Sequence, residues 1–177
     1  MSEYSKYPDI MPDNKTVISK MTHQDAICLS LEKILSLDDE AMKYFLLGHP
    51  FGKILRSYDQ FTSDGKPLYR NARGKSHYRY SIEAFSSGYS ANQLYGEHRI
   101  PLKIVKERLI ASDRSLETIT RIMKSNEVVL ITDHEQKLLD SRPPIGLGLR
   151  SKLPSCGTDR LKFAGIMIAE ETLNNRL

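Results

Sequence analysis

The chain has 177 residues, of which 40% are hydrophobic and 27% are charged, and its net charge is +4. This composition is typical of a globular domain and excludes a largely disordered chain. No apolar run approaches the roughly 20 residues that cross a bilayer. The N-terminal segment also lacks the apolar stretch of a secretory signal. The two cysteines, Cys28 and Cys156, cannot form a zinc cluster by themselves. We therefore expect a cytoplasmic protein with no membrane partner.

The order of the sequence patterns predicts an α+β fold. Residues 1–20 are polar and carry two prolines, so we expect a flexible N-terminal arm. Residues 21–177 are expected to form a single α+β domain. Its parts would be a helical N-terminal region, a basic β-hairpin, and a small mixed sheet packed by helices.

Two helices are predicted near the N-terminus. Thr22 followed by Asp25 is typical of a capped helix start, and apolar residues recur at helical spacing over residues 23–36. A second helix is predicted over residues 38–47, with its acidic residues in the first turn. Gly48 and Pro50 are expected to end it. These helices could serve as a scaffold or as the surface of a homodimer.

The segment from Phe51 to Tyr80 is the most basic part of the chain. It holds seven basic and two acidic residues, a net charge of +5, together with six of the fourteen aromatic residues. Basic groups neutralise phosphates and aromatic faces stack on bases, which favours a nucleic-acid surface. An equally open interpretation is a β-rich segment with tyrosines in the core and charges in solvent. A hairpin is predicted between residues 67–71 and the Tyr-rich stretch after residue 75. The residues expected to bind nucleic acid are Arg70, Arg73, Lys75, His77 and Arg79.

Local signals become clearer in the second half of the chain. Pro101 is expected to open a helix, Ser115 to cap another, and Thr132 with Glu135 to form a capping box for a third. The β-branched run Val128–Ile131 predicts a buried strand. The remaining expectations are a short helical turn over residues 91–95, a loop over residues 141–158, a strand over residues 163–168 and a helix from residue 170.

The Glu97-His98 pair just before Pro101 is the best candidate for a working centre. A histidine beside an acid can act as a general base while the carboxylate holds a metal nearby. The positive end of a helix dipole also favours the neutral imidazole that a base requires. The alternative is a surface histidine that happens to follow a glutamate.

The Glu-His-x-x-Pro opening, the helix, the strand and the Thr-x-x-Glu helix start resemble divergent HNH, or His-Me finger, nucleases. The resemblance covers roughly residues 94–140. It implies that Glu97 is a metal ligand and His98 the base that activates water. It also implies that His134 or Glu135 supplies a second ligand to Mg²⁺ or Mn²⁺. The sequence departs from the family pattern because no Asn and His follow His98 at the expected spacing.

Glu135 also permits two other interpretations. In a Thr-x-x-Glu capping box the glutamate bonds back to the backbone of the cap, which alone explains its presence. Glu135-Gln136-Lys137 together with Asp113 also resembles the PD-(D/E)xK site of restriction-type nucleases. That site requires its Glu and Lys on a strand, whereas the capping box predicts a helix here.

The sequence therefore favours a metal-dependent endonuclease, possibly of restriction type, that acts on DNA more readily than on RNA. The alternative is a non-catalytic module that binds nucleic acid or another protein. In that case the basic segment carries the function and Glu97-His98 is structural.

Overall fold

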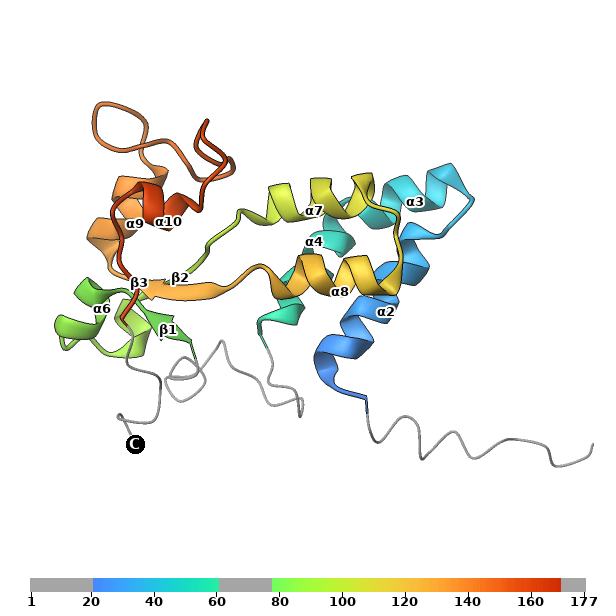
Figure 1. Ribbon diagram of the computed structural model, residues 1–177, viewed down its shortest axis with the longest axis horizontal. Helices are drawn as coiled ribbons and strands as arrows, with labels where there is room; N and C mark the ends of the chain where they lie inside the picture. Colours follow the sequence, from blue (N-terminus) through green and yellow to red (C-terminus); the bar gives the residue numbers. More distant parts are fainter. Residues whose placement is uncertain (1–20, 61–77, 170–177) are drawn as a thin grey trace, which may run out of the picture.

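The computed structural model describes residues 21–60 and 78–169 (Figure 1). The predicted arm over residues 1–20, the predicted hairpin at residues 67–71 and the predicted helix from residue 170 lie outside these ranges. Within them the chain forms helices and one small mixed sheet, which confirms the α+β class. No described helix is long and apolar enough to cross a membrane.

Five helices pack around one apolar core. They are α2 (His23–Leu35), α3 (Glu40–Leu47), α4 (His49–Tyr58), α7 (Leu102–Ala111) and α8 (Leu116–Lys124), and Figure 1 shows them gathered at one end of the molecule. In α2, α4, α7 and α8 the buried apolar side chains recur at helical spacing, so one stripe of each faces inward, while α3 adds the partly buried Leu47. The buried members of this helical core are Cys28, Leu31, Leu35, Phe51, Leu55, Tyr58, Val105, Leu109, Ile119 and Met123.

The predicted helix starts are confirmed where a side-chain cap was recognised. Thr22 accepts a hydrogen bond from the backbone of Asp25, whose carboxylate accepts one from the backbone of Thr22. Ser115 caps α8 through the backbone N–H of Thr118. These bonds satisfy N–H groups that have no partner inside the helix, which explains why the helices begin there.

The interpretation of the basic segment as β-rich was wrong for residues 51–58. These residues form α4, and Phe51, Leu55 and Tyr58 lie on one buried face of that helix. Gly48 and Pro50 interrupt the helical path for a single residue, because Gly48 is the N-cap of α4 and Pro50 lies in its first turn. Proline is accepted at that position since the first N–H groups of a helix have no intrahelical acceptor.

Three strands form the sheet at the other end of the molecule. β1 (Arg79–Tyr80), β3 (Val128–Ile131) and β2 (Tyr95–His98) lie side by side in that order. β1 pairs with β3 in parallel, and β2 pairs with β3 in antiparallel orientation. β2 leads into α7, and α8 leads back into β3, so two adjacent passes of the chain join the sheet to the helical part (Figure 1).

The central strand β3 is buried on both faces, which explains its unbroken apolar sequence. Short helix α6 (Ile82–Ser86) covers one face, and α9 (Asp133–Asp140) and α10 (Arg160–Phe163) contribute to the other. The 3₁₀ turn at Ala91–Gln93 precedes β2, close to the predicted helical turn. The first face holds Tyr78, Tyr80, Ala84, Leu94, Val128 and Leu130, and the second holds Val129, Ile131, Leu139, Leu161 and Ile166.

Two further predictions near the sheet were wrong. Residues 163–168 are not a strand, because Phe163 ends α10, Gly165 turns the chain with φ of +73°, and only Ile168 forms an isolated bridge, with Ser81. Glu97 and His98 do not lie in a free lead into a helix but form the end of strand β2. Side chains of adjacent strand residues point to opposite faces.

Candidate active site

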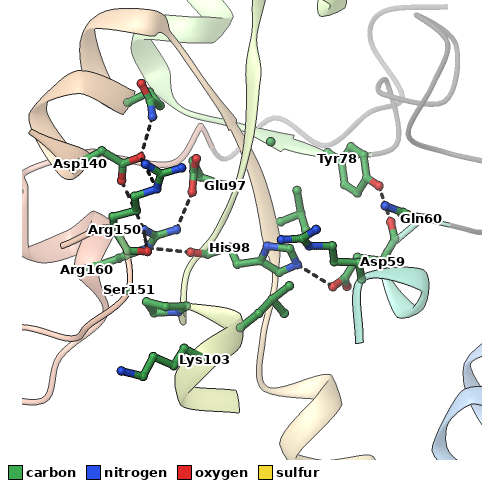
Figure 2. Close-up of a pocket in the computed structure, with 16 residues that line it drawn as sticks. Asp59, Gln60, Tyr78, Glu97, His98, Lys103, Asp140, Arg150, Ser151 and Arg160 are labelled. Atoms are coloured by element: carbon green, nitrogen blue, oxygen red, sulfur yellow. Dashed lines mark hydrogen bonds and ion pairs between the residues drawn. The ribbon is translucent and has the colours of Figure 1, made fainter. Parts of the chain in front are cut away.

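A cleft of about 690 Å³ lies where the sheet meets the helical part (Figure 2). Strand β2, the end of α4, the start of α7, α9 and the loop before α10 all contribute to it. The residues that line it are Arg56, Asp59, Gln60, Tyr78, Gly96, Glu97, His98, Pro101, Leu102, Lys103, Val128, Gln136, Asp140, Arg150, Ser151 and Arg160. Both members of the predicted Glu97-His98 centre border this cleft.

His98 forms a pair with Asp59. Its Nε2 lies 3.1 Å from Asp59 Oδ2, and both side chains are more than four-fifths buried. Because an ionised carboxylate can only accept hydrogen bonds, the contact requires a proton on His98 Nε2, and a neutral imidazole that meets this requirement carries its lone pair on Nδ1. The lone pair of His98 Nδ1 is then available to accept a proton. This is the arrangement that a general base requires.

Asp59 is itself held in place at the end of α4. It is the C-cap residue of that helix, and its backbone carbonyl accepts a hydrogen bond from the hydroxyl of Tyr78, just before β1. Tyr78 is buried against the sheet, so Asp59 is tied to both parts of the molecule (Figure 2). The His98 ring is thus oriented by a residue 39 positions earlier in the chain.

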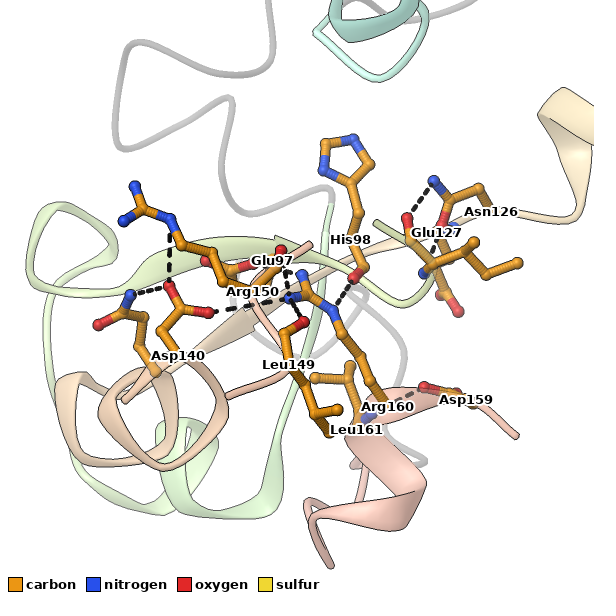
Figure 3. Close-up of polar contacts among 12 residues, drawn as sticks. Glu97, His98, Asn126, Glu127, Asp140, Leu149, Arg150, Asp159, Arg160 and Leu161 are labelled. Carbon is orange, nitrogen blue, oxygen red and sulfur yellow. Dashed lines mark hydrogen bonds and ion pairs between the residues drawn. The ribbon is translucent and has the colours of Figure 1, made fainter. Parts of the chain in front are cut away.

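Glu97 lies on the opposite face of β2 from His98, since it pairs with Val129 whereas His98 pairs with Val128. Its Oε2 accepts a hydrogen bond from Arg160 Nη2 at 2.5 Å. Arg160 also lies 3.9 Å from Asp140 Oδ1, so one buried guanidinium neutralises two carboxylates of the cleft (Figure 3).

The cleft carries a net positive charge. Arg56, Lys103, Arg150 and Arg160 contribute four positive charges against the three carboxylates of Asp59, Glu97 and Asp140. Within the described residues, no hydrogen bond or ion pair engages the side chain of Arg56. Lys103 and Arg150 form only long ion pairs of 4.0 Å and are largely exposed. These cations are therefore available to an anionic ligand beside His98.

Arg150 reaches the cleft because the loop before it is bound to the end of α9. The backbone N–H groups of Leu147, Gly148 and Leu149 donate to carbonyls of the last helical turn and Ser141. Gly146 lies so close to that turn that a Cβ atom there would approach three backbone oxygens to 2.7–2.8 Å. Only glycine permits this close approach, so the loop covers the helix end and presents Arg150 and Ser151 to the cleft.

The structure does not bring the predicted metal ligands together. Glu135 is buried and its Oε2 accepts hydrogen bonds from Ser81 Oγ and the backbone of Thr132, as the capping-box interpretation expects. His134 is exposed, with its Nδ1 3.4 Å from a carboxylate oxygen of Glu83. Neither residue lines the cleft with Glu97. No group of three or more His, Cys, Asp or Glu residues in the described ranges could hold a metal ion.

The residues that the restriction-type alternative requires also lie apart. Glu135 and Lys137 lie on helix α9, as the capping box predicts, and Lys137 pairs with Asp133, an interaction that raises the pKa of Lys137. The Asp113 carboxylate accepts hydrogen bonds from Ser115 and Thr118 at the start of α8, and these bonds lower its pKa. Glu135 and Asp113 therefore accept hydrogen bonds at the starts of two separate helices, α9 and α8.

The predicted nucleic-acid residues lie mostly outside the described ranges. Of that group only Arg79 is described, and it pairs with Glu127 at 3.5 Å on β1. Arg70, Arg73, Lys75 and His77 fall between residues 61 and 77. Apart from Arg79, the described cations that lie together at a candidate site are those that line the cleft.

Sequence reasoning missed most of the residues that surround His98. Asp59 and Arg56 were counted only within the basic segment over residues 51–80, and Lys103 was assigned no role. The periodic apolar positions of α4 could have placed Arg56 and Asp59 at the polar end of a helix. Arg160 follows Asp159, which caps α10 through the backbone N–H of Leu161, and that local signal was overlooked.

Comparison with protein-family models, with curated proteins and with solved structures found no match.

Proposed function

We propose that this protein is a nuclease that hydrolyses phosphodiester bonds of nucleic acid in the cleft beside His98. One observation carries the proposal, which is the His98–Asp59 pair set among cations that have no close partner among the described residues. The imidazole has a carboxylate on Nε2 and an open Nδ1, and Arg56, Lys103 and Arg150 border the same cleft. A base and a set of phosphate-binding cations are the two components that phosphodiester hydrolysis needs.

The reaction follows from these positions. His98 Nδ1 accepts a proton from a water molecule as the water oxygen attacks phosphorus, and the bond from phosphorus to the leaving oxygen breaks. Asp59 stabilises the imidazolium that forms, as an acid does behind a catalytic histidine. Arg56, Lys103 and Arg150 bind the non-bridging oxygens, where negative charge accumulates in the transition state. The proton on the imidazolium then returns to the leaving oxygen or to solvent.

The predicted requirement for a divalent metal is tested separately from the role of His98. Mg²⁺ prefers several oxygen ligands, but Glu97 is paired with Arg160 and Glu135 is used in the cap, so these residues do not fit the predicted ion. We therefore assign no step to it. Activity is to be compared with Mg²⁺, with Mn²⁺ and with a chelator.

The decisive experiment compares three proteins on labelled duplex DNA, single-stranded DNA and RNA. The wild type is expected to cleave at least one substrate, with DNA tested first. His98→Ala is expected to lower the rate by about 10²-fold or more, since a positioned base contributes that much. His134→Ala is the matched control, because His134 is exposed, lies outside the cleft, and is expected to leave the rate unchanged. Equal cleavage by the wild type and His98→Ala would point to a contaminating nuclease and reject the proposal.

A non-catalytic nucleic-acid module is the second candidate, and one observation favours it. Arg160 already pairs with both Glu97 and Asp140, which leaves the exposed charges of the cleft mainly cationic. If the wild type binds but never cleaves, Arg56→Gln and Lys103→Gln should weaken binding. Each should reduce the salt slope of log K by about 1. His98→Ala should then leave binding unchanged.

A further inference from the structure

Arg160 is the most deeply buried charge of the cleft. It is 2% exposed, and its guanidinium contacts three separate parts of the chain. Nε donates to the carbonyl oxygen of His98 at 2.9 Å, and Nη2 donates to Glu97. Nη1 donates to the carbonyl oxygens of Leu149 at 3.2 Å and Arg150 at 3.4 Å (Figure 3). A buried charge is costly unless it is paired, and here Glu97 and, at 3.9 Å, Asp140 of α9 provide two negative partners.

The bond to the His98 carbonyl completes the edge of the sheet. In an antiparallel pair, successive residues direct their N–H and C=O groups alternately toward and away from the neighbouring strand. The backbone N–H of Arg99 donates to Glu127 beside β3, so the polar backbone groups of His98 point to the open side of β2. Arg160 takes the place that another strand would fill there.

The position of Arg160 is itself set by its neighbours in sequence. Asp159 caps α10 and also accepts a hydrogen bond from Arg99 Nε at 2.5 Å, while Leu161 is fully buried against β3 and α9. These two anchors fix the backbone on either side of Arg160. Its side chain therefore extends to β2 from a rigid base, and its planar fork matches several acceptors at once.

We propose that Arg160 is the positioning residue of this cleft, a proposal that rests on the proposed function. It holds the backbone of His98 so that the imidazole meets Asp59, and it holds the loop that presents Arg150. It does not touch the scissile phosphate. Its charge also neutralises Glu97 and Asp140, which would otherwise repel an anionic substrate. A lysine would supply the charge but not the three-way fork.

The test uses the full chain with Arg160→Lys, and with Arg108→Lys as the matched control. Arg108 is an exposed arginine of α7 that does not line the cleft. Displacement of a base by about 1 Å costs up to about 10²-fold in rate, so Arg160→Lys should lower kcat by about tenfold or more. KM should change less than threefold, because the charge is kept. In Arg108→Lys, kcat should stay within about twofold of the wild type.

A second measurement does not depend on activity. The ¹⁵N chemical shifts of His98 report its tautomer, which Asp59 holds with the proton on Nε2. In Arg160→Lys these shifts should move toward those of a histidine in solution, and in Arg108→Lys they should not. If Arg160→Lys does not fold, Glu97→Gln removes one of the charged partners of Arg160 and should move the shifts in the same direction by a smaller amount.

The outcomes separate the two proposals. If the wild type never cleaves nucleic acid, the proposed nuclease activity is rejected. The ¹⁵N shifts then still decide whether Arg160 orients His98. Unchanged kcat and unchanged His98 shifts in a folded Arg160→Lys protein would overturn the positioning role. A raised KM at constant kcat would also overturn it, because that result would place Arg160 among the substrate contacts.

Discussion

The helical core and the cleft are held together by different kinds of interaction. The core formed by α2, α4, α7 and α8 consists of apolar side chains whose spacing repeats within each helix. The cleft brings together charged side chains from distant segments, and hydrogen bonds and ion pairs hold His98, Asp59, Glu97 and Arg160 in place. Packing in the core is non-directional and tolerates similar shapes, whereas each cleft contact needs one particular geometry. Substitutions in the core should therefore change stability, and substitutions in the cleft should change activity.

The largest effect is expected in the helical core. Phe51 is fully buried there, so Phe51→Ala should lower the free energy of unfolding by about 3–5 kcal/mol, because it leaves a cavity. Chemical denaturation followed by circular dichroism measures this change. Tyr44→Ala is the control, since Tyr44 is 85% exposed and should change stability by less than about 0.5 kcal/mol. Similar losses in both variants would show that the core is placed wrongly.

In the cleft, the next largest effect is expected on rate. Asp59→Asn should lower kcat by about 10²-fold, because the amide no longer fixes the His98 tautomer or stabilises its imidazolium. The free energy of unfolding should change by less than about 1 kcal/mol, since Asn keeps the shape. Steady-state kinetics and denaturation are measured on the same preparation. Asp38→Asn, at an exposed position, is the control, and a similar loss of rate there would contradict the role of Asp59.

Substitution of Glu135 tests whether its carboxylate is structural or binds a metal. Glu135→Gln should lower the free energy of unfolding by about 1–2 kcal/mol, because the charged oxygen accepts bonds from Ser81 and Thr132. The cleavage rate should change less than threefold, as expected for a residue that makes no contact in the transition state. A large loss of rate with unchanged stability would restore the interpretation of Glu135 as a metal ligand.

The smallest effect concerns Tyr58 at high pH. Burial in the helical core raises the pKa of Tyr58 to about 12 from its ordinary value of 10.0. Between these values the unfolded chain has lost the tyrosine proton while the folded chain keeps it, so stability decreases as pH rises. Tyr58→Phe should therefore show a weaker decrease above pH 10 than the wild type, which urea unfolding at several pH values can measure. Equal decreases would mean that Tyr58 titrates normally.

Much of the fold could be predicted because its signals are local. The capping boxes at Thr22 and Thr132 and the strand at Val128–Ile131 depend on residues within a few positions of each other. Helix α4 was missed because residues 51–58 were grouped with a basic, possibly β-rich segment, although three buried positions follow a helical period. The strand predicted at residues 163–168 failed because its apolar residues pack singly rather than in a ladder.

The sequence by itself determined where the capped helices α2, α8 and α9 begin and that Val128–Ile131 is a buried strand, and it singled out Glu97-His98 as a candidate site. Only the tertiary structure decided what that pair does, since His98 meets Asp59 across 39 residues and Glu97 meets Arg160 across 63. No periodicity links such positions, because long-range contacts depend on how the helices and the sheet pack. The physical result is a division of roles within the pair. Glu97 is neutralised by a buried arginine, and His98 is left facing the cleft with an oriented imidazole.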